Sequence, residues 1–294
     1  MRVTHNQMAN AITENLFRHA ESLLKAQKIV STTKKINSPS DDPNGMVKVL
    51  AYRKTLASID QYKTNISNGK TWIEISQTAL EEIESLLGTV KQVAVDQSAG
   101  NLDTRAIALE EAKDLYDQIL SLANTKCGNS YVFAGHESTT APFSRDNDYV
   151  ATYHGDDGEI KIIIGENTEA RINATGEELF DSGTDVFGVL KQLIDGLETD
   201  PYDPSDVYDL IGPLNNAVTQ IRESNAQIAT TYTRLGLTEN QLSKFKLNIE
   251  NMLSDTEKAD MTQAIVDLQQ QEAAYEIALE VAARIIQPNL IDFL

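Results

Sequence analysis

Residues 214–256 read LNNAVTQIRESNAQIATTYTRLGLTENQLSKFKLNIENMLSDT. Apolar residues recur here at alternating steps of three and four, which is the spacing of one face of a long helix. Nine of the thirteen positions in the series are apolar, and only Gly236 could weaken the helix. The series is Leu214, Val218, Ile221, Asn225, Ile228, Tyr232, Leu235, Glu239, Leu242, Lys246, Ile249, Leu253 and Thr256. The stretch therefore predicts a helix longer than an ordinary globular helix, with an apolar seam along one side.

A second seam lies upstream, at Ile66, Ile73, Ser76, Leu80, Ile83, Leu87, Val90 and Ala94. It stops at Gly100, and a further helix is predicted from Ala106 to Ala123, with Asp103 or Thr104 as its cap. Two long seams can form the core of an intramolecular bundle or the stripe of an extended dimer. We favour the bundle because the long segment between the seams can return the chain antiparallel to itself.

The segment between the seams is rich in helix breakers, with nine glycines and four prolines in residues 131–213. Residues 148–165 contain two β-rich runs around Gly-Asp-Asp-Gly (155–158), which predicts a hairpin with Ile162, Ile163 and Ile164 buried on both faces. Residues 169–176 can add a short strand. Residues 137–181 hold eleven acids and three bases, so this β insert is predicted to face solvent.

The predicted fold class is mainly α with a small β insert (α+β). We expect an elongated antiparallel helical bundle, paired terminal helices and a central small β domain. The predicted domains are residues 1–45 with 255–294 for the terminal helices, residues 46–130 with 186–254 for the bundle, and residues 131–185 for the acidic β domain.

Both ends of the chain read as amphipathic helices with narrow apolar stripes. Such helices bury too little to be stable alone, so they must pair with each other or be completed by another molecule. The residues predicted to pack are Met8, Ile12, Leu16, Leu23, Ile265, Leu268, Leu279, Ile286 and Leu290.

The connector KKINSPSDDPNG (34–45) is more specific than a helix turn requires. Asp42 before Pro43 predicts a helix start, because the carboxylate caps the first turn and proline fits the first helical position. Pro39 keeps Ser38 out of the helical region, and Asn37, Ser38 and Ser40 can bond nearby amides. The local rules thus predict a structured joint between two helices.

Composition argues against several classes of function. The net charge of −19 disfavours nucleic acids and anionic membranes as partners. The single cysteine, Cys127, excludes an internal disulfide, and the four histidines show no metal-ligand spacing. No catalytic motif is found, so we expect neither an enzyme nor a cofactor or metal site. No cleaved signal or membrane span is visible, which by itself would indicate a cytoplasmic protein.

Five stretches resemble the bacterial flagellin family, and its hook-associated members more than filament flagellin. STTKKINSPSDDPNG (31–45) resembles the family's spoke loop, and MRVTHNQM (1–8) its opening. NSYVFAGHESTTAPF (129–143), residues 153–180 and RIIQPNLIDFL (284–294) are similar to its central segment, small β domain and tail. The order and spacing of these stretches cover essentially the whole chain.

This resemblance implies a structural adaptor that joins the hook side of the flagellum to the flagellin filament as a ring of subunits. The implied partners are the hook-side hook-associated junction protein, flagellin, further copies of the chain and a flagellar export chaperone. The protein would lie outside the cell, exported by the flagellar type III apparatus without a cleaved signal. The implied assembly joint comprises Ile36, Asn37, Ser38, Asp41, Asp42 and Pro43.

Two alternatives stay open at this stage: a minor flagellin within the filament, and a secreted coiled-coil effector or adhesin. The chain also departs from the family at Lys34-Lys35, where many relatives have Gly-Lys or Gly-Arg. This departure predicts a turn without a left-handed residue.

Overall fold

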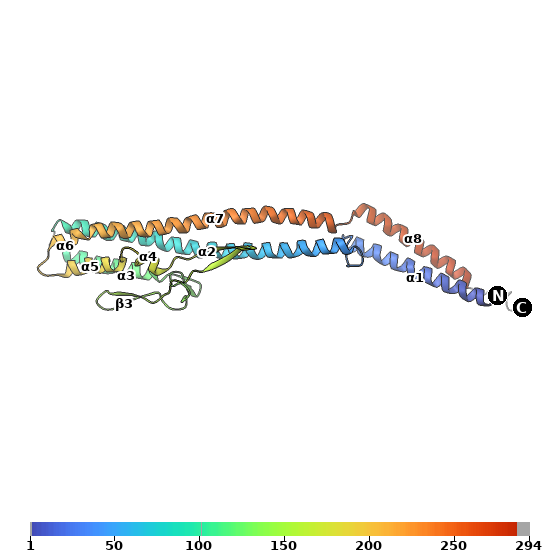
Figure 1. The fold of residues 1–294 in the computed structure, drawn as a ribbon, viewed down its shortest axis with the longest axis horizontal. Coiled ribbons are helices and arrows are strands. Elements are labelled where there is room, and N and C mark those ends of the chain that lie inside the picture. The colour runs from blue at the N-terminus through green and yellow to red at the C-terminus, as the bar shows by residue number, and fades with distance from the viewer. Residues whose placement is uncertain (1, 101, 287–294) are drawn as a thin grey trace. The chain divides into compact units, whose positions relative to one another are not determined.

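The structure is a computed structural model that describes the backbone of residues 2–100 and 102–286 and the side chains of residues 7–100 and 102–284. Helices make up 71% of it, which confirms the predicted mainly α fold with a small β insert (Figure 1). The helices are α1 Arg2–Thr32, α2 Pro43–Ser98, α3 Arg105–Ala123, α4 Gly176–Phe180, α5 Val186–Glu198, α6 Pro204–Asp209, α7 Ile211–Glu257 and α8 Met261–Ile286.

The strands are short and form three separate antiparallel pairs. They are β1 Lys126–Cys127, β2 Ser130–Tyr131, β3 Phe143–Arg145, β4 Ala151–Tyr153, β5 Lys161–Gly165 and β6 Thr168–Arg171. The chain forms two compact units. We call residues 1–58 with 245–294 the terminal unit, and residues 59–244 the bundle unit.

The core of the bundle unit is the predicted pair of seams. Ile66, Ile73, Leu80 and Leu87 of α2 share one buried cluster with Leu214, Ile221, Ile228 and Leu235 of α7. Three polar contacts fix the register: Lys70 with Glu239, Glu74 with Tyr232, and Glu84 with Arg222. In these three pairs the α2 residue number increases while the α7 residue number decreases. The two helices are therefore antiparallel within one molecule, as predicted (Figure 1).

Helix α3 packs on α5 in the same unit and begins where predicted. Thr104 occupies the N-cap position, but its side chain makes no capping bond, because Thr104 Oγ1 instead accepts a bond of 2.9 Å from Gln97 Nε2. The predicted boundary is therefore right, and the predicted side-chain cap is wrong.

The prediction of a hairpin over residues 148–165 is wrong, although strands lie near both of its ends. Strand β4 pairs with β3, with Phe143 opposite Tyr153, and β5 pairs with β6. Burial of the isoleucine run on both faces is also wrong: Ile164 is buried, whereas Ile163 is 51% exposed.

Asp156 explains why residues 155–158 do not form a hairpin turn. Its Oδ1 accepts hydrogen bonds from the amides of His136 and Gly158, and its own amide donates to the carbonyl of Ala134. The loop is thus bound to residues 134–136. In addition, Phe143 packs against Phe180 and Phe187, so the aromatic core places β3, and β4 pairs with it.

The terminal unit contains the paired helices α1 and α8, which lie side by side in Figure 1. Backbone hydrogen bonds join the segment after α1 to the segment before α8. The amide of Lys35 donates to the carbonyl of Glu257, and the amide of Ala259 donates to the carbonyl of Thr33. Lys34 and Lys258 form an antiparallel bridge there. Within residues 2–100 and 102–286, no helix combines the length and apolarity needed to span a membrane.

The close approach of the Asp156 loop to Gly135 gives a test of this arrangement. Gly135 has φ +67°, and a Cβ there would lie 2.2 Å from the carbonyl oxygen of Asp156. Gly135→Ala should therefore lower the free energy of unfolding by about 3 kcal/mol in urea denaturation. Gly128→Ala is the matched control, because Gly128 has φ +62° with open space around it. It should cost only about 1 kcal/mol, and equal losses in the two variants would contradict the packing described.

Candidate assembly joint

The predicted joint lies entirely within the terminal unit, between the end of α1 and the start of α2. Helix α1 ends at Thr32, and Thr33 adopts a left-handed conformation with φ 59°. The sequence departure at Lys34-Lys35 predicted a turn without such a residue. That prediction is wrong, because the left-handed position falls one residue earlier, on Thr33.

Asp41 organises the loop from its centre. One carboxylate oxygen, Oδ2, accepts hydrogen bonds from the amides of Asn37 (3.0 Å) and Ser38 (2.9 Å) and from Ser38 Oγ (3.0 Å). The other oxygen lies 3.2 Å from the Lys25 ammonium on α1. Asn37 in turn donates from Nδ2 to the carbonyl of Lys34. A single carboxylate thus connects the loop backbone to the preceding helix.

These bonds lower the pKa of Asp41 from 3.8 to about 2. The amide of Asn37 is the largest favourable cause, and desolvation opposes it. Because the folded-state pKa is below the unfolded value, the carboxylate stabilises the joint fully above pH 4. That stabilisation is lost as the pH falls from 3.8 through about 2.

Asp42 caps α2, as predicted. Its Oδ1 accepts a hydrogen bond of 2.9 Å from the amide of Gly45, and the helix begins at Pro43. Gly45 also permits a close contact, since a Cβ there would lie 2.5 Å from Ile36 Cδ1. Ile36 is only 4% exposed, and it is the apolar anchor of the joint.

Glu257 is a central residue of the joint that sequence reasoning missed. It is 5% exposed and receives an ion pair from Lys34 and another from Arg53 Nη2 at 2.6 Å. The residue lies one position beyond the seam and more than 200 residues from Arg53, so no local pattern points to it. It holds the end of α7 against the connector and the first turns of α2.

The predicted terminal-helix residues divide into two groups. Ile12, Leu16 and Leu23 of α1 and Leu268 of α8 are half-buried, whereas Met8, Ile265 and Leu279 are 56%, 45% and 44% exposed. The side chain of Ile286 and the whole of Leu290 lie outside the described residues.

The joint has the chemistry of a structural connector. Its carboxylates accept hydrogen bonds or pair with cations, and its apolar anchor is buried. In the part of the chain that the structure describes, no three His, Cys, Asp or Glu residues are grouped so that they could hold a metal ion.

Two family models match the chain. The model of the bacterial flagellin N-terminal helical region matches residues 3–138, and that of the bacterial flagellin C-terminal helical region matches residues 211–294. Together they include α1–α3, the joint and α7.

Individual relatives match over most of their lengths. Flagellar hook-associated protein 3 of Escherichia coli is 25% identical over 277 residues, covering 88% of this chain and 86% of that protein. The flagellar filament 33 kDa core protein of Treponema phagedenis is 22% identical over 91% of this chain and 90% of its own length. The crystal structure of flagellar hook associated protein-3 from Legionella pneumophila has the same fold, with a TM-score of 0.65 and 13% identity. It covers 70% of this chain and 98% of that chain.

The role of Asp41 can be tested by following the amide resonances of Asn37 and Ser38 in the full chain by NMR. Both should titrate with a midpoint near pH 2, because they report the carboxylate that they bond. Asp41→Asn should abolish this titration and destabilise the joint by about 1 kcal/mol, since solvent screens the loop. Asp255→Asn removes an exposed carboxylate nearby and should leave the titration unchanged. A midpoint near 3.8 in the native chain would refute the arrangement.

Glu257→Gln tests the ion-pair centre of the joint. The substitution leaves Lys34 and Arg53 without a charged partner, and because both cations are half-exposed we expect a cost of about 1–2 kcal/mol. The Lys35 amide, which donates to the Glu257 carbonyl, should exchange its hydrogen about tenfold faster. Glu250→Gln, which removes only a weak pair with Lys246, is the control. Equal exchange in both variants would exclude a central role for Glu257.

Proposed function

The chain belongs to the bacterial flagellin family, and on that premise we propose that it is a structural adaptor of the flagellum. In this role a ring of its subunits joins the hook side to the flagellin filament. The observation that carries the proposal is the match to flagellar hook-associated protein 3 over 88% of this chain and 86% of that relative. A match of this extent spans most of both chains.

The proposed partners are the hook-side hook-associated junction protein, flagellin, other copies of the chain and, before assembly, an export chaperone. Exposed apolar side chains on the terminal unit support the proposal that partners bind there. Phe17, Leu24 and Ile277 are 72%, 65% and 61% exposed, although the unit has few buried residues of its own. Apolar exposure of this kind on a small unit is typical of surfaces that become buried on association.

We assign the three predicted domains to roles in the assembly. Residues 1–45 with 255–294 form the inner-tube region, residues 46–130 with 186–254 the bundle around it, and residues 131–185 the acidic outer part. The joint sets how the chain passes from the first domain to the second, through Asp41 and Asp42. The protein functions outside the cell, after export by the flagellar type III apparatus.

A filament subunit is the second candidate. It is favoured by the match to the Treponema phagedenis filament core protein, which covers as much of this chain as the match to the hook-associated relative. The two candidates differ in where the protein acts: a junction protein is needed for any filament to attach, whereas a minor flagellin contributes to filaments that form without it.

Deletion of the gene separates these candidates. Electron microscopy of the deletion strain should show hooks without filaments, and the culture supernatant should contain unpolymerised flagellin. That outcome follows because export continues while the filament has nothing to attach to. Intact filaments on the deletion strain would exclude the junction role and leave the minor flagellin.

Complementation of the same strain tests the joint. The native chain should restore filaments, whereas the double variant Asp41→Ala with Asp42→Ala should be secreted normally without restoring them. This result is expected because the variant loses both the loop centre and the helix cap. Normal motility with the double variant would remove the joint from the proposed mechanism.

A further inference from the structure

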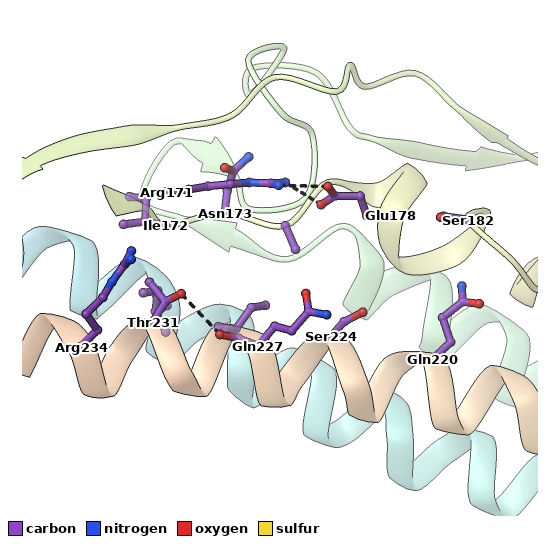
Figure 2. Close-up of a pocket in the computed structure, with 13 residues that line it drawn as sticks. Arg171, Ile172, Asn173, Glu178, Ser182, Gln220, Ser224, Gln227, Thr231 and Arg234 are labelled. Carbon is purple, nitrogen blue, oxygen red and sulfur yellow. Dashed lines mark hydrogen bonds and ion pairs between the residues drawn. The ribbon is translucent and has the colours of Figure 1, made fainter. Parts of the chain in front are cut away.

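A polar groove lies in the bundle unit, between α7 and the segment that runs from β6 to α4 (Figure 2). Its volume is about 380 Å³. Ile172 and Ile228 contribute to its apolar floor, and Ser224 and Gln227 project into it from α7. Arg234 borders it at one end, where a bound group can reach the guanidinium.

Arg234 is unusual among the arginines of this chain. Every other arginine whose side chain the structure describes has an acid or an aromatic ring in contact, whereas Arg234 has neither. Arg171, on the opposite wall, is already paired with Glu178 and Glu159. An unpaired arginine on the wall of a groove, in a chain of net charge −19, indicates a site for a carboxylate.

The outer face of the β5–β6 hairpin carries an acidic and an apolar side chain, which complement the arginine and the apolar floor of the groove. Its inner face packs Ile164 and Ala170 into the core, while Ile163 points outward and is 51% exposed. Glu169 lies directly opposite Ile163 in the strand register, so both side chains share the outer face. Among the described residues, Glu169 has no ion pair within 4 Å. Beyond that distance, Lys161 of the same hairpin attracts it electrostatically. An exposed isoleucine beside a carboxylate without a contact ion pair is the counterpart of an apolar floor beside Arg234.

We propose that the β5–β6 hairpin of one subunit docks into the α7 groove of the next subunit in the ring, with Glu169 paired to Arg234. Ile163 then covers the edge of the floor formed by Ile172 and Ile228. The two surfaces differ, so the contact is heterologous, and heterologous contacts generate rings when the rotation closes. Copies of so acidic a chain repel each other on average, so a contact in the bundle unit is favoured where a positive group faces a negative one. The inference rests on the proposed ring and names a contact within it.

Charge reversal tests the pair in the deletion strain, with filaments retained after shear as the readout. Arg234→Glu and Glu169→Arg should each reduce retained filaments about tenfold, because each places like charges at the contact. Combining the two should restore most of the native number. Lys244→Glu and Glu198→Arg make equal charge changes at exposed positions outside both surfaces and should behave like the native chain.

Failure of the docking contact can be distinguished from failure of the proposed junction role. Filaments on the deletion strain would overturn the junction role itself. If the native chain restores filaments but the single reversals match their controls, or the combined variant is no better than either single variant, the docking contact alone is overturned.

Crosslinking identifies the occupant of the groove. In a Cys127→Ser background, Glu169→Cys and Arg234→Cys together should give multimers of the chain when intact flagella are treated with a short bismaleimide. Either cysteine alone should give none, because the contact joins two different surfaces. Absence of multimers, or linkage of the groove cysteine to another flagellar protein, would overturn assignment of the groove to a second copy.

Discussion

The antiparallel register of α2 on α7 is the constraint on which the rest of the bundle unit depends. The buried apolar residues of the two seams supply most of the energy, since burial of each Ile or Leu contributes roughly 1.5–3 kcal/mol. The polar pairs along the seam contribute at most about 1 kcal/mol each at their exposure. Their importance lies in register, because Lys70, Glu74 and Glu84 each meet a partner at one alignment of the helices only. Asn225, whose Oδ1 is buried without a partner, is a further polar residue in the seam, and polar residues at such positions favour register at a cost in stability.

The joint of the terminal unit is stabilised mainly by charged groups and not by apolar burial. Its connector has one buried apolar residue, Ile36, and depends otherwise on three carboxylates. Asp41 gathers backbone amides, Asp42 caps a helix, and Glu257 joins two cations. Carboxylate-to-amide bonds are directional, so they define a backbone path with little hydrophobic area. A joint of this kind forms from contacts within the chain itself and does not depend on a cover over the exposed apolar side chains of α1 and α8.

The sequence was informative wherever structure is periodic or local. The three–four spacing predicted α2 and α7, and the Asp42-Pro43 pair predicted the start of α2, because both signals lie within a few residues. Strand pairing was not predictable, since Phe143 and Asp156 decide it through contacts with distant residues. Glu257 was missed for the same reason: its partners are Lys34 and Arg53, and nothing around residue 257 distinguishes it from other helix-end glutamates. Likewise Arg234 reads as a solvent-facing helix residue until the groove beside it is known.

Net charge links the two units to assembly. A net charge of −19 makes copies of the chain repel each other, and this repulsion opposes self-association in solution. The same repulsion opposes any ring, so apolar exposure alone is insufficient to form one with defined geometry. The terminal unit supplies the apolar area, as Phe17 and Ile277 illustrate. Local reversals of charge, such as the arginine at the α7 groove, supply the selectivity. In the proposed ring, apolar contact area and charge selectivity are thus carried by different surfaces, so copies can stay apart in solution and still join in one orientation.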